Sequence, residues 1–252
     1  MGVHRTNHTN TCAIDKPAAE CVDTKLAPEC VDTKAVVKEH LLADTKAPLG
    51  PSTFWQEIFS GVSSILQFFY VLATSQSIAS IAPHPEYVYG IVAGNAIVSM
   101  CSALFHFECA LRSGSAYVGS LLVTNCMDLG SQHLVDTVIS YCLSRGTAWF
   151  VVVNAMFNVF CLGSRCLRQV QGRERKGEPE VERCAAAVAL YLFALVLRGD
   201  FTHLFACLCW AMLAGLCMAL DERTNGWGWG LMHLCLGPFV VHLLLSAAMD
   251  DR

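Results

Sequence analysis

The sequence predicts an all-α, polytopic membrane protein with seven transmembrane helices and a disordered N-terminal tail. Two observations lead to this fold class. Of the 252 residues, 54% are hydrophobic and only 15% are charged, whereas a soluble globular domain carries about 25% charged residues. The charges are also concentrated in residues 1–53 and in a basic cluster at 165–183, which leaves long apolar runs elsewhere. We therefore divide the chain into a tail, 1–53, and a transmembrane domain, 54–252.

The tail contains a degenerate repeat but no pattern of a packed core. Residues 12–16, 21–25 and 30–34 are similar pentapeptides at nine-residue spacing, and 42–46 is a more divergent copy of the same pentapeptide. Low complexity, interspersed prolines and few aromatic residues favour disorder. No apolar run follows the first methionine, so no signal peptide is predicted.

Seven stretches of the transmembrane domain approach the roughly 20 apolar residues that a spanning helix needs. Phe54 and Trp55 are expected as interfacial aromatics before the first stretch, and the Pro83-His84-Pro85 sequence ends it. The third stretch is the least apolar. The fifth is short, and six spans is the alternative if 183–220 rearranges. The predicted spans are 58–82, 87–111, about 120–143, 147–165, 183–198, 201–220 and 227–248.

Basic residues in the short loops predict the orientation of the chain. With seven spans, the tail shares one side of the membrane with most of the lysines and arginines: Lys34, Lys38, Lys46, Arg112, Arg168, Arg173, Arg175, Lys176 and Arg223. The other side has little more than Arg145, Arg198 and Arg252. The N-terminus is therefore predicted to be cytosolic. This orientation favours acylation at the Gly2 start over glycosylation of the Asn7 sequon.

Three ionisable side chains lie inside predicted spans: His106, Asp128 and His233. A charge at the centre of a membrane helix costs at least about 2.5–3.5 kcal/mol, so such residues are functional-site candidates. Helix rise puts them roughly 7–8, 12 and 10 Å from the same cytosolic side. Ser102 lies one helical turn from His106 and shares its face.

Two imidazoles and a carboxylate at one depth are suited to a zinc ion or to general acid–base chemistry. Zinc lowers the pKa of a bound water towards 7, and a nearby carboxylate can accept its proton. In a membrane bundle, the carbonyl within reach is a lipid ester or amide. The expected partners are membrane lipids, and no nucleic acid is expected. The structural alternative for these side chains is hydrogen bonding between helices.

Other polar residues are weaker candidates. His133, about 7 Å deeper than Asp128 along its helix, and Asp136 are expected to support the site or to bond between helices. Cys109 is a further ligand candidate. His242 lies some 13 Å beyond His233 and nearly on the opposite helix face, so both are not expected to bind one metal. The cysteines in apolar helices are expected to be reduced, buried hydrophobes.

At these residues the chain resembles the CREST superfamily of seven-helix membrane hydrolases and receptors. The family has a Ser and a His one turn apart in the second helix, an Asp in the third, and two His one turn apart in the seventh. Ser102-Ala-Leu-Phe-His106 is similar to the first element. Cys126-Met-Asp128-Leu-Gly-Ser131 resembles the second, most closely in the version of the transmembrane protein 8 family. Trp229-Gly-Leu-Met-His233 occupies the third.

The resemblance implies zinc-dependent hydrolysis of a lipid ester or amide bond. His106 and His233 would be metal ligands, Asp128 the base or water-orienting residue, and Ser102 a supporting catalytic residue. One of the paired His positions of the family's last helix is Trp229 here, or Gly237 if His233 is taken as the first of the pair. In both cases the resemblance implies a metal site that lacks one ligand.

Two rival functions stay open at this point. The first is a non-catalytic membrane receptor or scaffold with a degenerate site. The second is a proton-coupled transporter in which His106, Asp128 and His233 relay protons, although the sequence has no visible inverted repeat.

Overall fold

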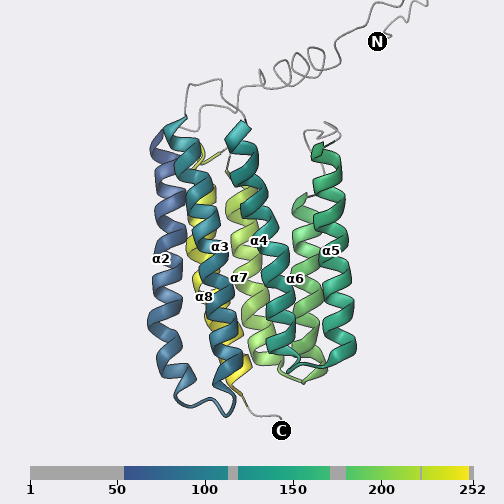
Figure 1. Cartoon of the computed structure of the whole chain (residues 1–252). Helices are drawn as coiled ribbons and strands as arrows, with labels where there is room; N and C mark the ends of the chain where they lie inside the picture. The colour runs from purple at the N-terminus through teal and green to yellow at the C-terminus, as the bar shows by residue number, and fades with distance from the viewer. Residues whose placement is uncertain (1–53, 113–118, 171–179, 222, 250–252) are drawn as a thin grey trace, which may run out of the picture. The chain divides into compact units, whose positions relative to one another are not determined.

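The computed structural model describes residues 54–112, 119–170, 180–221 and 223–249, and every regular element in them is an α-helix (Figure 1). The all-α prediction is therefore confirmed for this part of the chain, while the predicted tail lies outside it. All described helices belong to one compact unit, residues 41–252. The helices are α2 (Phe54–Ala79), α3 (Pro85–Leu111), α4 (Gly119–Leu143), α5 (Ala148–Val170), α6 (Glu180–Leu197), α7 (Phe201–Ala219) and α8 (Gly228–Ala248).

Five of these helices are long and apolar enough to cross a membrane: α2, α3, α5, α7 and α8. Helix α4 is not among them, because polar residues such as Asp128 and Asp136 interrupt its apolar sequence. Helix α6 has only 18 residues, and its first turn includes Glu182 and Arg183. The described residues form seven helices where seven were predicted, and spanning by α4 and α6 stays a prediction.

Helices that follow one another in sequence pack side by side, and α8 returns to pack against α2 (Figure 1). Helix α8 also contacts α3, α4 and α7, so it meets both halves of the helix order. The apolar core includes Val71, Ile91 and Leu243, which are fully buried. Large apolar side chains such as Phe205 and Met212 point outward, as expected for helices solvated by lipid.

Glycines bring the first helices close together. A Cβ atom at Gly61 on α2 would lie 2.6 Å from the ring of Phe107 on α3, and one at Gly94 on α3 would lie 2.8 Å from Val135 on α4. Both distances are too short for a side chain. Small residues at these positions therefore permit the close helix approach that membrane proteins use, and they hold α3 between α2 and α4.

Helix α2 begins at Phe54, four residues before the predicted start of the first span. The two aromatic residues expected outside the helix are thus its first two residues. The other helix ends lie within a few residues of the predicted boundaries, apart from α5, which continues to Val170. The earlier start of α2 places Glu57 inside the bundle, with consequences for the site.

The turn between α6 and α7 ties together one end of the bundle. The guanidinium of Arg198 donates hydrogen bonds to the carbonyls of Leu143 (3.3 Å), Ser246 (3.1 Å) and Met249 (3.2 Å). These carbonyls lie at the ends of α4 and α8, where helices lack internal donors. Gly199 follows with a φ of 69°, and Asp200 caps α7. Arg198 therefore joins the ends of α4 and α8 through its hydrogen bonds.

Candidate functional site

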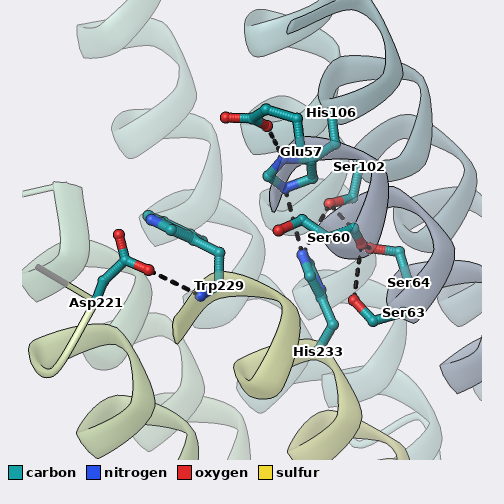
Figure 2. Close-up of polar contacts among 9 residues, drawn as sticks. All are labelled: Glu57, Ser60, Ser63, Ser64, Ser102, His106, Asp221, Trp229 and His233. Carbon is teal, nitrogen blue, oxygen red and sulfur yellow. Dashed lines mark hydrogen bonds and ion pairs between the residues drawn. The ribbon is translucent and has the colours of Figure 1, made fainter. Parts of the chain in front are cut away.

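His106 of α3 and His233 of α8 meet inside the bundle (Figure 2). Their Nε2 atoms are 3.5 Å apart, and their rings are nearly perpendicular, with centroids 5.5 Å apart. Both residues are buried, at 6% and 7% exposure. The contact forms because α8 packs directly against α3. Two of the three ionisable residues singled out in the sequence therefore lie together.

Ser102 lies beside this histidine pair. Its Oγ is 3.4 Å from Nε2 of His233 and 3.5 Å from Oγ of Ser64 on α2. Ser102 is 2% exposed, and it precedes His106 by one helical turn, so both side chains point from the same face of α3. A hydroxyl can donate to one neighbour and accept from another. Ser102 thus links the pair to α2.

Glu57 of α2 is a site residue that the sequence analysis missed. Its Oε2 lies 2.8 Å from Nδ1 of His106, on the side of the ring opposite His233 (Figure 2). Both side chains are mostly buried, at 8% exposure for His106 and 18% for Glu57. The signal was a carboxylate directly before a serine-rich apolar run. It was overlooked because the first span was predicted to begin at residue 58.

The Glu57 contact determines which nitrogen of His106 is available. An ionised carboxylate only accepts hydrogen bonds, so Nδ1 of His106 carries a proton. In the neutral ring the lone pair then lies on Nε2 and faces His233. Nε2 of His233 must either donate a proton to that lone pair or share a cation with it. The geometry is therefore suited to holding a proton or a metal ion between the two rings.

Asp128 of α4 lies next to the pair without a hydrogen bond to either ring. It is within electrostatic range of His106 and of Arg165 on α5, and close to Ser102. The residue is 8% exposed, and its Oδ1 takes no hydrogen bond from the described residues. Buried carboxylate oxygens are normally satisfied. This unpartnered carboxylate oxygen, on a residue within electrostatic range of His106, is thus available to a ligand.

Two of the ligands that a zinc ion needs are in place, the Nε2 atoms of His106 and His233. With Zn–N distances of about 2.0–2.1 Å, two ligands of a tetrahedral ion lie roughly 3.3–3.4 Å apart, close to the 3.5 Å between the two Nε2 atoms. The carboxylate behind His106 is the partner that metal-binding histidines usually have. In the described residues, however, no group of three or more His, Cys, Asp or Glu side chains is arranged to hold a metal ion, Cys109 included.

Trp229 stands near the place where a third ligand was expected. Its ring centroid is 6.4 Å from that of His106, and its main-chain nitrogen donates to Oδ1 of Asp221, 3.2 Å away (Figure 2). The indole is 42% exposed. Trp229 therefore borders the site as an aromatic side chain with no metal-binding atom.

The remaining candidates lie elsewhere. Nδ1 of His133 is 2.9 Å from Oδ1 of Asn158 on α5, so this histidine bonds between helices, as its structural alternative predicted. Asp136 lies near Tyr191 of α6. His242 contacts His203 of α7, with Nδ1 atoms 3.3 Å apart. His242 and His233 therefore belong to different pairs.

Comparisons of the chain with family models, with curated proteins and with solved structures found no match.

Proposed function

We propose that this chain is a multi-pass membrane hydrolase that cleaves an ester or amide bond of a lipid. The observation that carries the proposal is the pair of facing Nε2 atoms, 3.5 Å apart, with the Glu57 carboxylate on the far side of His106. This arrangement presents imidazole lone pairs to a common point inside apolar helices. A substrate that reaches such a point from the surrounding membrane is a lipid.

The roles follow from the contacts. A zinc ion, which the resemblance implies, would be held by His106 and His233 and would supply an acidified water near neutral pH. Glu57 keeps the proton of His106 on Nδ1. Asp128, with its unpartnered Oδ1, accepts the proton of the attacking water. Ser102, whose Oγ lies 3.4 Å from Nε2 of His233, would stand beside the metal and could hydrogen-bond the bound water.

The reaction then balances as a simple hydrolysis. The water oxygen bonds to the carbonyl carbon of the lipid, and its proton passes to Asp128. The C–O or C–N bond breaks, and the leaving alcohol or amine takes the proton back from Asp128. The products are a fatty acid and the remainder of the lipid. The expected substrates are membrane lipids with one ester or amide bond near their polar end.

The test is hydrolysis of a panel of lipid esters and amides by the purified full chain in lipid nanodiscs. We expect His106→Ala to lower turnover by more than the roughly 10–100-fold that loss of the outer partner of a metal ligand costs, because this variant removes a ligand itself. His242→Ala is the matched control, a histidine outside the site, and it should retain turnover within about twofold. Equal turnover of the two variants contradicts the proposal.

The second candidate is a receptor or scaffold with a degenerate site. Two observations favour it. Trp229 occupies the expected ligand position, and only two histidines come together at the site in the described residues. It predicts a folded chain that turns over no lipid of the panel and binds no zinc. The same purified protein therefore decides between the two functions.

A further inference from the structure

Helices α2 and α3 face each other through a ladder of buried polar side chains that begins at the site. Three contacts form its rungs: Glu57 with His106 at 2.8 Å, Ser64 with Ser102 at 3.5 Å, and Gln67 with Asn95 at 2.9 Å. We call these six residues and Ser99 the polar ladder. Asn95, Ser99, Ser102 and His106 follow one another at spacings of four, three and four, so they share one face of α3.

The polar ladder extends deep into apolar surroundings. Asn95 is eleven residues before His106, which is roughly 16 Å along the helix, and it lies near the middle of α3. Gln67 and Asn95 are each 6% exposed, and Ser64 is fully buried. Polar groups in hydrocarbon need partners. The ladder therefore has to satisfy its own donors and acceptors, or bind something that does.

Two groups in the ladder are not satisfied by the described residues. Nδ2 of Asn95 and Oγ of Ser99 have no hydrogen-bond partner there, although the side chains are 6% and 3% exposed. In sequence, Ser99 falls between the Gln67–Asn95 rung and the Ser64–Ser102 rung. The two unpartnered groups are therefore neighbours, one helical turn apart on one face.

Ser99 also differs from most other serines of the bundle. A buried helical serine usually bonds back to a carbonyl three or four residues earlier. The hydroxyls of eight serines here do so: Ser63, Ser64, Ser75, Ser80, Ser131, Ser140, Ser144 and Ser164. Ser99 forms no such bond. Its hydroxyl is thus available to a ligand from the same face as the amide of Asn95.

We propose that the polar ladder is a binding site for ordered water, held by the Asn95 amide and the Ser99 hydroxyl. Buried water typically makes about three hydrogen bonds to polar groups that lack other partners, and a donor amide and a hydroxyl one turn apart offer such groups. Ser102, the next ladder residue, is 3.4 Å from His233. The bound water therefore hydrates the histidine pair from inside the bundle, whatever chemistry the pair performs.

The test is water-edited solid-state NMR of the full chain in lipid bilayers, with asparagine labelled by nitrogen-15. We expect fast polarisation transfer from water to the Asn95 side-chain amide, assigned by its loss in Asn95→Ser. Asn158 is the internal control, since it is 1% exposed, its amide donates to the Asn154 carbonyl at 3.0 Å and its Oδ1 lies 2.9 Å from Nδ1 of His133. Transfer to Asn95 no faster than to Asn158 overturns the proposal.

A second measurement uses the sign of a stability change. Removing a hydroxyl that binds water loses hydrogen bonds, whereas removing an unsatisfied one relieves a cost. We expect Ser99→Ala to lower the unfolding midpoint by roughly 2–4 °C relative to the unmodified chain. Ser140→Ala, which removes a buried hydroxyl that donates to the Thr137 carbonyl at 2.9 Å, gives the scale of one lost hydrogen bond. A Ser99→Ala midpoint at or above that of the unmodified chain contradicts the proposal.

Discussion

Helix α8 takes part in two histidine pairs that look alike and differ in what surrounds them. His233 meets His106 of α3, and His242 meets His203 of α7, with ring centroids 5.5 and 5.6 Å apart. The first pair is buried, with a carboxylate on one ring and a serine on the other. The second is only partly buried, and within the described part of the chain no carboxylate is hydrogen-bonded to either ring.

The carboxylate near the second pair is used differently. Asp200 caps helix α7, and its Oδ1 accepts from the main-chain nitrogen of His203, 3.3 Å away. It stabilises the start of helix α7 through the main chain and is not hydrogen-bonded to a histidine ring. Glu57 instead bonds a ring nitrogen and so sets the tautomer of His106. The two pairs therefore differ in one respect that matters for chemistry: a carboxylate orients a ring nitrogen only in the first pair, which is buried.

The largest expected difference between the two regions concerns these carboxylates. Glu57→Gln should lower turnover about 10–100-fold, the usual cost of removing the supporting partner of a site histidine, because an amide no longer holds the proton of His106 on Nδ1. Asp200→Asn should leave turnover within about twofold. Turnover of both variants on the same lipid checks this, and near-wild-type turnover of Glu57→Gln would remove the distinction between the pairs.

A smaller effect, on stability alone, is expected at the other end of the bundle. Arg198→Ala removes three hydrogen bonds that tie α4 to α8, and hydrogen bonds to charged groups are worth about 1.5–3 kcal/mol each. We expect a lowered unfolding midpoint with turnover per folded molecule unchanged. Denaturant titration measures the first and hydrolysis the second. A large loss of turnover without a loss of stability would show that the two ends are coupled.

The sequence predicted the helices and much of the candidate site, because apolar runs mark membrane helices and ionisable residues are rare within them. Connectivity placed His106, Asp128 and His233 at one depth. It could not say which way a side chain faces, and His133, on the same helix as Asp128, bonds to α5 instead. Packing against neighbouring helices decides that direction.

Glu57 and the polar ladder were missed for two physical reasons. A shift of four residues in the start of α2 moves Glu57 from the expected membrane surface into the bundle, and helix ends are the least predictable feature of a sequence. Serine is frequent at the interfaces of membrane helices, and a single polar residue such as Asn95 does not reveal which partner it faces. The contacts of the polar ladder follow from the packing of α2 against α3, which the sequence does not specify.

Metal analysis of the purified full chain tests the central claim most directly, since that claim is that His106 and His233 form a ligand pair and His203 and His242 do not. We predict about one zinc per chain, lost in His233→Ala and retained in His242→Ala, with both variants folded as judged by circular dichroism. A folded wild-type chain without zinc, or zinc that both variants retain equally, would contradict the account.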